Sequence, residues 1–292
     1  MKNIQRFVAL CLVALACTPI CVAGVVINDT IKSEILKSDI PLCVYLPDGF
    51  NHDKEQQYPI LYLLHGLTDN ERAWTDKGQM ERVADDLMRS GESRKMVIVM
   101  PCAGGQDIHK VWNGYFNMPG WNYEDFFFTE LMPMVEQKYR AKGGREWRAI
   151  AGLSMGGGGS VNYALRHHED FCACYAMSAW LGSSKSLQSS PKYGKGKFYY
   201  LQAAVDSLAA VRVLEAFDAE ERKAVNQVAW FIDCGDDDFL LDQSVEFYQK
   251  MRQLRIPAQF RVRDGNHNWE YWHTALRMCL PFVSRSMGEG YK

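Results

Sequence analysis

Hydrophobic residues along this chain gather in short continuous runs, separated by longer stretches in which apolar positions recur every three to four residues. The continuous runs predict strands that are covered on both faces, and the recurring pattern predicts amphipathic helices. Strands are expected at 25–36, 40–46, 59–66, 96–100, 147–151, 171–179, 227–234 and 257–263. Helices are expected at 76–89, 123–139, 157–166, 201–223, 241–255 and 269–286.

This alternation of strands and helices predicts an α/β fold with a mainly parallel central sheet and helices on both faces. The first two strands are close enough to form an antiparallel hairpin at one edge of the sheet. The helical segment 201–223 follows a polar, Gly/Ser-rich stretch and is expected to form a small cap. Because no repeat or linker interrupts the pattern, we expect one domain over residues 24–292, with its chemistry at the carboxyl ends of the strands.

One predicted strand-to-helix junction reads Gly152-Leu153-Ser154-Met155-Gly156. A turn this tight strains the serine backbone and leaves no room for a Cβ atom two residues before or after it, which explains both glycines. Strand, G-x-S-x-G and helix together form the nucleophile elbow of the α/β-hydrolase fold. A phosphate-binding loop is the alternative, but the required lysine is missing. Ser154 is therefore the predicted nucleophile.

A serine nucleophile needs a histidine base, and in this fold the base comes last along the chain. Of the seven histidines, only His267 and His273 follow a plausible acid. His267 lies in the turn Asp264-Gly265-Asn266-His267, directly after a predicted strand, whereas His273 falls inside the last predicted helix. We therefore expect His267 to be the base.

The acid that orients the histidine should follow the preceding strand. Three adjacent carboxylates occupy that loop, Asp236, Asp237 and Asp238. All three cannot be buried at low cost, so one is expected to turn towards His267 while the others stay in water. Their spacing does not distinguish among them. A calcium loop is excluded because the alternating ligand spacing of an EF-hand is absent.

Two backbone N–H groups are needed to stabilise the negative charge that develops on the substrate oxygen. The residue after the nucleophile, Met155, is expected to supply one. The second should come from the loop after an early central strand, which here reads His65-Gly66-Leu67-Thr68. Leu67 is the predicted second donor, unless His65-Gly66 is a simple strand-ending turn.

The first 23 residues have the features of a secretory signal peptide. Lys2 and Arg6 form a basic start, residues 7–16 are apolar, and a small-residue cleavage site ends at Ala23. A membrane anchor is the alternative, but the apolar run is too short to span a bilayer. Lipidation at Cys17 is a weaker alternative. We therefore predict an exported protein, either periplasmic or secreted, with no membrane span.

Composition adds constraints on partners. The chain is 47% hydrophobic and 23% charged, with a formal net charge of −2, so nothing in its composition suggests the basic face expected of a nucleic-acid-binding protein. Six cysteines follow the leader, and most lie in or beside apolar strands, where a small buried hydrophobe is the expected role; pairing remains open. No metal or organic cofactor is implied. The oligomeric state is not determined.

Four segments taken in order resemble the esterase D-like family of α/β-hydrolases, which includes feruloyl and acetyl xylan esterases, tributyrin esterases, S-formylglutathione hydrolases and mycolyltransferases. The opening segment at 44–66 is similar to the family's first strands, and Gly152–Gly157 is similar to its elbow. Residues 234–240 resemble the segment in which the last acid, before a hydrophobic pair, belongs to the triad. The resemblance therefore assigns that role to Asp238. Residues 265–269 are similar to the histidine motif.

The resemblance implies a serine carboxylesterase that acts through an acyl-enzyme. An acyltransferase and an S-formylglutathione hydrolase-like thioesterase are alternatives within the enzymes, although the predicted export disfavours the latter. A non-catalytic glycan-binding protein is the alternative from another class, and the complete set of catalytic residue types argues against it.

Aromatic residues interleaved with amides and glycines suggest the substrate. Trp112 and Trp121 lie in the loop after the fourth strand, Trp180 follows the strand after the elbow, and Trp269 follows His267. All four are expected at the carboxyl edge of the sheet, where flat rings beside amides suit a sugar or a phenolic acyl group. Filling of the gap between loop and helix is the alternative. Together with export and the family's sugar-ester branch, they favour feruloyl or acetyl esters of xylan as substrates.

Overall fold

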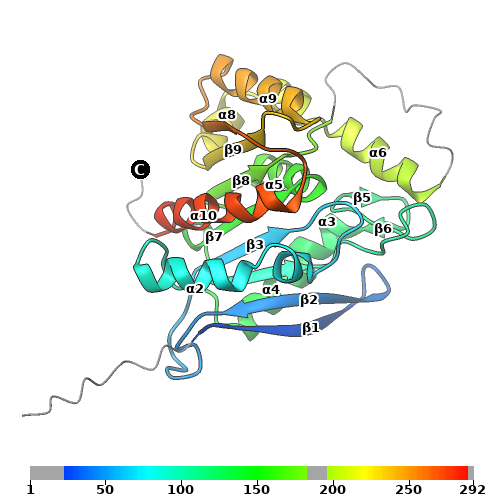
Figure 1. Cartoon of the computed structure of the whole chain (residues 1–292). Coiled ribbons are helices and arrows are strands. Elements are labelled where there is room, and N and C mark those ends of the chain that lie inside the picture. The colour runs from blue at the N-terminus through cyan, green and yellow to red at the C-terminus, as the bar shows by residue number, and fades with distance from the viewer. Residues whose placement is uncertain (1–22, 183–195, 289–292) are drawn as a thin grey trace, which may run out of the picture.

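An eight-stranded sheet forms the middle layer of the molecule (Figure 1). The computed structural model describes residues 23–182 and 196–288. The strand order is β1-β2-β4-β3-β7-β8-β9-β10, with antiparallel pairing at β1–β2 and β2–β4 and parallel pairing elsewhere. The strands are β1 (Val25–Ser33), β2 (Ser38–Leu46), β3 (Ile60–Leu64), β4 (Val97–Pro101), β7 (Arg148–Leu153), β8 (Ala173–Met177), β9 (Ala229–Gly235) and β10 (Gln259–Arg263).

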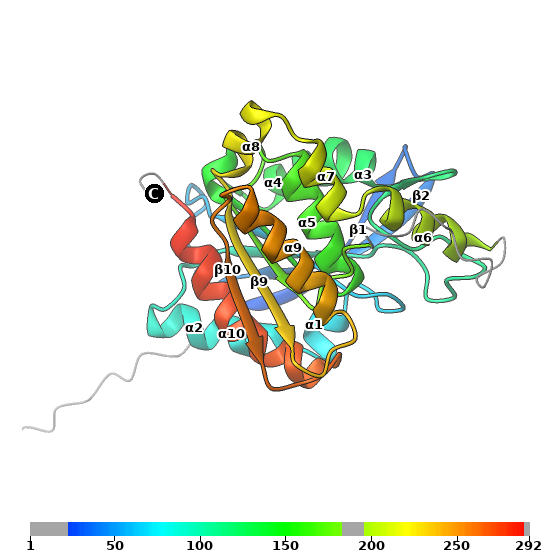
Figure 2. The ribbon, with the colours of Figure 1, turned by 90° about the horizontal axis from the view of Figure 1, so that it is seen from above.

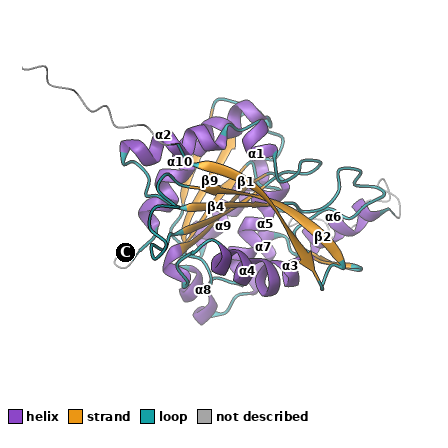
Figure 3. Cartoon of the chain, turned by 90° about the horizontal axis from the view of Figure 1, so that it is seen from below, coloured by secondary structure: helices purple, strands orange, loops and turns teal. Residues whose placement is uncertain are grey.

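Helices cover both faces of this sheet (Figures 2 and 3). One face carries α1 (Ala73–Asp76), α2 (Met80–Ser90) and α10 (Trp269–Ser286), whose apolar residues share one core cluster. The other face carries α3 (Tyr123–Phe126), α4 (Met132–Lys138), α5 (Met155–Arg166), α7 (Ala210–Ala216) and α9 (Leu241–Gln253). The remaining elements are α6 (Lys197–Ser207), α8 (Ala219–Val225), β5 (Asn117–Met118), β6 (Trp121–Asn122), a π-helical turn at Phe127–Leu131 and a 3₁₀ turn at Arg145–Trp147.

The central strands are apolar throughout because both of their faces are covered. Every residue of β3, β4 and β8 is buried, as expected for parallel strands between two layers of helices. The α/β-hydrolase architecture with its edge hairpin is thus confirmed.

The predicted helix at 76–89 corresponds mainly to α2, and of α1 it includes only the last residue, Asp76. Gln79 adopts a left-handed conformation with φ of 50°, which ends one helical path and starts another. The break allows both Trp74 and Met80 to be fully buried. Amphipathic periodicity reports the buried face of a helix but not a change of helix axis.

The predicted helix at 123–139 is interrupted by a π-helical turn at Phe127–Leu131. Pro133 lies at the start of the following segment, α4. Because proline has no N–H to donate to the preceding turn, a wider turn before it accommodates the lost hydrogen bond, and the helical path continues without a break.

The predicted cap segment forms three helices instead of one. Helix α6 lies beside the β5–β6 hairpin at the edge of the molecule, and α7 packs on α5 and α9 (Figures 1 and 2). The hairpin was not predicted, because two-residue strands are too short to show an alternating pattern. Most of the Gly/Ser-rich stretch before α6 lies outside the described residues.

The six cysteines after the leader are free and buried in this structure, which fits the expected hydrophobic role. Burial raises the pKa of the Cys102 thiol to about 11. In the described part of the chain, no helix has the length and apolarity that crossing a membrane requires. The predicted leader, including Cys17, lies outside the described residues except for Ala23.

Candidate active site

Ser154 lies on the sharp turn between β7 and α5, with φ of 53° and ψ of −116°. A Cβ atom on Gly152 would lie 2.4 Å from the carbonyl oxygen of Gly156, and a Cβ atom on Gly156 would lie 2.5 Å from the carbonyl oxygen of His65. Any larger residue at either position would therefore displace backbone. The two glycines permit the strained conformation that presents the Ser154 side chain at the end of the strand.

His267 reaches Ser154 from the loop between β10 and α10. Its Nε2 lies 3.0 Å from Oγ of Ser154. Asn268 begins α10 by accepting a hydrogen bond from the amide of Tyr271 at 3.1 Å, which fixes the end of this loop. The centroid of the imidazole lies 4.5 Å from that of the Phe239 ring and 4.9 Å from that of the Trp272 ring.

The other side of the imidazole faces Asp238. Nδ1 of His267 lies 2.8 and 3.0 Å from the two carboxylate oxygens. Burial by itself raises the pKa of Asp238, but hydrogen bonds from His267, Ser178 and the amide of Leu240 outweigh it and hold the pKa below the ordinary value. An ionised carboxylate can only accept, so the ring proton belongs on Nδ1 and the lone pair of Nε2 faces Ser154.

The other two acids of the loop lie differently. Asp237 is exposed, and Asp236 accepts a hydrogen bond from the amide of Gly265 at 2.9 Å. Asp236 thereby links the loop after β9, which carries the three acids, to the loop after β10, which carries His267. Of the three carboxylates, the one adjacent to His267 is Asp238, the same residue that the family resemblance indicated.

Ser178 and Trp272 support the position of the Asp238 carboxylate through hydrogen bonds. This contribution was not predicted. Nε1 of Trp272 donates to Oγ of Ser178 at 3.1 Å, and Ser178 in turn bonds to the carboxylate of Asp238. Ser178 is fully buried and Trp272 almost so. A polar residue directly after a buried strand, in Met177-Ser178-Ala179, was the available signal in the sequence.

A buried ion pair joins the two strands that carry the acid and histidine loops. Asp233 on β9 is fully buried, and its two carboxylate oxygens accept hydrogen bonds from Arg263 on β10 at 3.0 and 3.1 Å. Tyr175 and Tyr271 also donate to this carboxylate, at 2.7 and 2.5 Å. Such a fully satisfied buried charge fixes the register of β10, and hence the start of the His267 loop.

The loop after β3 lies beside the serine. A Cβ atom on Gly66 would lie 3.6 Å from Cβ of Ser154. His65 is buried, its Nε2 accepts a hydrogen bond from the amide of Ala103 at 2.9 Å, and its Nδ1 lies 2.8 Å from the carbonyl oxygen of Gly66. The proton is therefore on Nδ1, which donates to Gly66.

This hydrogen bond has a consequence for Leu67. The C=O of one residue and the N–H of the next point in opposite directions within the same peptide plane. By holding the Gly66 carbonyl, His65 also fixes the direction of the Leu67 N–H. No hydrogen bond among the described residues uses that N–H. Met155 is the first residue of α5, so its N–H has no partner within the helix.

The four predicted aromatic residues differ in their surroundings. Trp180 is half-buried, its amide donates to the carbonyl of Ser154 at 2.9 Å, and its ring packs near Phe198. Trp112 packs near Tyr200, and Trp269 packs against Trp74 and Trp272. Trp121 exposes only 7% of its surface, and its Nε1 donates to a backbone carbonyl at 3.1 Å. Trp121 therefore offers little open ring to a ligand.

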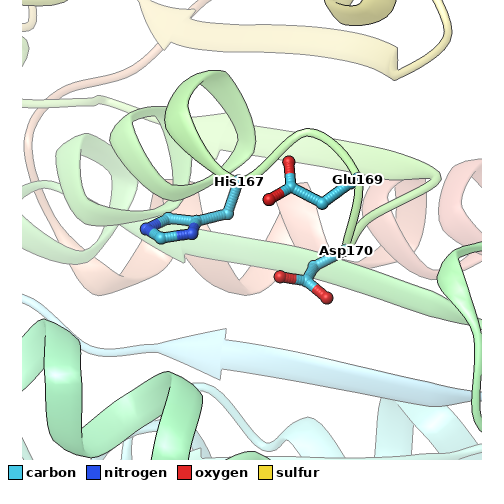
Figure 4. Close-up of side chains that lie close together, drawn as sticks. All are labelled: His167, Glu169 and Asp170. Carbon is cyan, nitrogen blue, oxygen red and sulfur yellow. The ribbon is translucent and has the colours of Figure 1, made fainter.

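A second group of polar side chains lies at the far end of α5 from Ser154. His167, Glu169 and Asp170 have potential ligand atoms within 4.8 Å of one another (Figure 4). However, Nε2 of His167 lies 2.7 Å from Glu124, and Asp170 pairs with Arg148 at 3.4 Å. These contacts give the group a structural explanation. The predicted absence of a metal remains a prediction.

A cavity of about 690 Å³ also lies away from Ser154. Its lining includes Cys172, Ala229 and Gln259, which mark the amino ends of β8, β9 and β10. Because Ser154 follows the carboxyl end of β7, this cavity is at the opposite end of the sheet.

Comparison with known proteins relates this geometry to a family. The sequence profile of the family described as "Putative esterase" matches residues 33–283. A solved structure of a ferulic acid esterase is 49% identical, with a TM-score of 0.86, and the match covers 91% of this chain and 99% of that chain.

Two further relatives are known from sequence. An endo-1,4-beta-xylanase/feruloyl esterase of Xylanibacter ruminicola is 33% identical over 131 residues, which is 44% of this chain and 18% of that protein. An acetyl esterase of Caldicellulosiruptor saccharolyticus is 22% identical over 272 residues, covering 87% of this chain and 96% of that protein. The chain thus matches a small part of the first relative and nearly all of the second.

The profile match and the identity to the ferulic acid esterase both extend over most of the chain. They confirm the family expected from the four sequence segments. This chain belongs to the putative esterase family and is an ester-hydrolysing serine hydrolase of the α/β-hydrolase fold.

Proposed function

We propose that this chain is an exported serine carboxylesterase that cleaves feruloyl or acetyl esters of plant polysaccharide, xylan above all. The observation that carries the proposal is the continuous line of contacts from Ser154 through His267 to Asp238. A nucleophile, a neutral base and an ionised orienting acid within hydrogen-bond reach are the parts that acyl transfer requires.

In the proposed first half-reaction, Oγ of Ser154 attacks the ester carbonyl carbon while Nε2 of His267 takes the hydroxyl proton. The carbonyl oxygen becomes an oxyanion, which the N–H groups of Leu67 and Met155 stabilise. As the C–O bond of the ester breaks, His267 gives its proton to the departing alcohol oxygen. The acyl group remains on Ser154.

In the second half-reaction, water takes the place of the alcohol. His267 removes a proton from the water, whose oxygen attacks the acyl carbon, and the proton then passes to Oγ of Ser154. The products are a carboxylic acid and free enzyme. Asp238 stays ionised throughout and holds the imidazole in one tautomer. No step of this mechanism requires a metal or an organic cofactor.

The substrate class is supported by the relatives and by the aromatic residues. The 49% identical structure is a ferulic acid esterase, and one sequence relative carries a xylanase together with a feruloyl esterase. The amide of Trp180 contacts the carbonyl of Ser154, and Trp112 lies in a different loop, at 101–122. In this proposal their rings provide flat faces for a sugar or phenolic ring. We leave Trp121 out of this proposed surface because it is nearly closed to solvent.

A substrate panel tests this proposal. We expect kcat/KM to be higher for feruloylated and acetylated xylo-oligosaccharides than for long-chain lipid esters or S-formylglutathione. A preference for long acyl chains or for the thioester would overturn the proposed substrate class. Addition of a sugar acceptor in place of water, followed by product analysis, distinguishes hydrolysis from acyl transfer. Absence of labelling by a fluorophosphonate probe would favour a non-catalytic glycan-binding protein.

The proposed export rests on the first 23 residues, which have the basic, apolar and small-residue regions of a signal peptide. Expression of the full chain in a bacterial host with cell fractionation tests it. We expect periplasmic or secreted protein whose first residue is Gly24. Retention of the leader in a membrane fraction, or a lipid on Cys17, would contradict this expectation.

A further inference from the structure

Phe239 is an exposed aromatic residue beside the candidate base. It exposes 74% of its surface, which is the largest value for any large hydrophobic residue that the structure describes. The residues on either side of it, Asp238 and Leu240, are both buried. The Leu240 amide also donates to the Asp238 carboxylate at 2.8 Å. The backbone is thus held on both sides of Phe239 while its ring remains in solvent.

The position of the ring relates it to one part of the ester. Its centroid lies 4.5 Å from that of the His267 imidazole, at an angle of 48°. In the proposed mechanism, His267 protonates the departing alcohol, so the alcohol oxygen must come within hydrogen-bond distance of Nε2. The atoms of the alcohol that follow this oxygen therefore extend away from Ser154 on the side of His267. The alcohol portion of the substrate is therefore the part that passes near Phe239.

We propose that Phe239 is a specificity-determining residue that stacks on the sugar ring carrying the ester. This inference rests on the proposed function, and it concerns the alcohol rather than the acyl group. The apolar face of a sugar packs on an aromatic ring, while its hydroxyls need polar partners. Asp237 lies two residues before Phe239 and Asn266 lies directly before His267, and both are exposed. In this proposal the Asp237 carboxylate and the amide nitrogen of Asn266 are those partners, since Oδ1 of Asn266 already accepts a hydrogen bond from the His267 amide at 2.7 Å.

An alternative role is that Phe239 shields the contact between His267 and Asp238 from water. Loss of such a shield would impair the base itself, so every ester would be affected in proportion. Loss of a stacking surface affects only substrates whose alcohol is a sugar. Two esters with the same acyl group and different alcohols therefore separate the two roles.

The experiment compares Phe239→Ala and Phe239→Trp with the unmodified enzyme on methyl ferulate and on a feruloylated arabinoxylo-oligosaccharide. For Phe239→Ala, we expect KM for the sugar ester to rise roughly two- to tenfold, with kcat nearly unchanged. Kinetics on methyl ferulate should stay within about twofold. Phe239→Trp should retain sugar-ester kinetics close to those of the unmodified enzyme, since it retains a flat ring.

Val262→Ala serves as the matched control, because Val262 is also an exposed hydrophobic residue but lies on β10. It should change neither ester. Equal losses on both esters in Phe239→Ala, or no change on the sugar ester, would overturn the inference. Unchanged thermal unfolding of each variant shows that the fold is retained.

A second pair of esters separates this inference from the proposed function. Acetylated xylo-oligosaccharide and ethyl acetate differ in their alcohol in the same way. If the unmodified enzyme hydrolyses neither ferulate, the feruloyl part of the proposed function fails, and the acetyl pair still tests Phe239. A sugar-specific loss with the acetyl pair supports the stacking role, and a loss on both acetates overturns it.

Discussion

Nε2 of His267 lies 3.0 Å from Oγ of Ser154, although 113 positions separate the two residues in the sequence. The distance depends on two loops at the carboxyl edge of one sheet, the turn after β7 and the loop after β10. The proposed chemistry requires this contact, and the first prediction tests it directly.

We expect Ser154→Ala to fold normally and to lose nearly all ester hydrolysis, because a nucleophile of this kind contributes about 10⁴-fold or more to the rate. The measurement is kcat on a small aryl acetate, with fluorophosphonate labelling as a second readout. Ser90→Ala, at the end of α2, is the matched control and should retain activity. Near-normal turnover by Ser154→Ala would remove Ser154 from the mechanism.

The three adjacent acids should respond differently to amide substitution. Asp238→Asn is expected to lower kcat by on the order of 10⁴, because an amide favours the wrong imidazole tautomer while substrate binding remains. Asp237→Asn should have a small effect, since that carboxylate is exposed. Asp236→Asn retains an oxygen that can accept from Gly265, so its effect should also be small. A severe effect of Asp236→Asn or Asp237→Asn, together with a mild effect of Asp238→Asn, would show that Asp238 is not the acid that orients His267.

The buried His65 should make stability depend on pH. Burial lowers the pKa of His65 below its ordinary value of 6.5. Below about pH 6.5 the unfolded chain binds a proton that the folded chain does not, so the free energy of unfolding falls with decreasing pH until the lowered pKa of the folded state is reached. Urea unfolding between pH 7 and pH 5 measures this loss.

His65→Gln is the informative variant for that effect. A glutamine amide has both an acceptor and a donor but does not titrate, so the loss of stability between pH 7 and pH 5 should become smaller. An equal loss in the variant and in the unmodified protein would show that another group causes it.

His65→Ala should also lower kcat more than it raises KM, because the Leu67 N–H then loses its fixed direction.

Substitution of Trp112 and substitution of Trp121 should change different properties of the protein, substrate binding and stability respectively. Trp121→Ala removes a buried ring and is expected to lower the free energy of unfolding by about 3–5 kcal/mol. Trp112→Ala, whose ring is less buried, should raise KM for a sugar ester more than for a small aryl acetate. Thermal unfolding and paired kinetics measure the two effects. Equal kinetic losses on both substrates in Trp112→Ala would remove Trp112 from the sugar-binding surface.

Cleavage after Ala23 should change one contact at the start of the domain. The backbone nitrogen of Gly24 lies 2.8 Å from Oδ1 of Asp85, which also accepts from Tyr45. Cleavage turns that amide into a charged amino group and the contact into an ion pair. A chain that begins at Gly24 should therefore be more stable than one extended by Ala23, by roughly 0.2–1 kcal/mol.

Urea unfolding of the two chains, each with and without Asp85→Asn, measures this coupling as a double-mutant cycle. The stability difference should disappear in the Asp85→Asn background. A difference of the same size in both backgrounds would show that the amino group does not interact with Asp85.

The sequence by itself determined the fold class, the order of the central elements and the positions of Ser154 and His267. These follow from local signals: continuous apolar runs for covered strands, and glycines flanking a serine where no Cβ fits. The family resemblance was needed to choose Asp238, because three neighbouring carboxylates have the same local pattern. The bounds of α10, at Trp269–Ser286, were also predicted from the pattern.

Only the tertiary structure decided how Asp236, Ser178, Trp272 and His65 support the site, and that the ring of Phe239 stays in solvent. Most of the supporting hydrogen bonds join residues distant in sequence: Ser178 and Trp272, for example, are 94 positions apart. The break between α1 and α2 and the π-helical turn also depend on tertiary packing. They allow Trp74, Met80 and Phe127 to be buried against the sheet. Periodicity shows that a residue is buried, whereas its hydrogen-bond partner is set by how distant segments meet in the packed core.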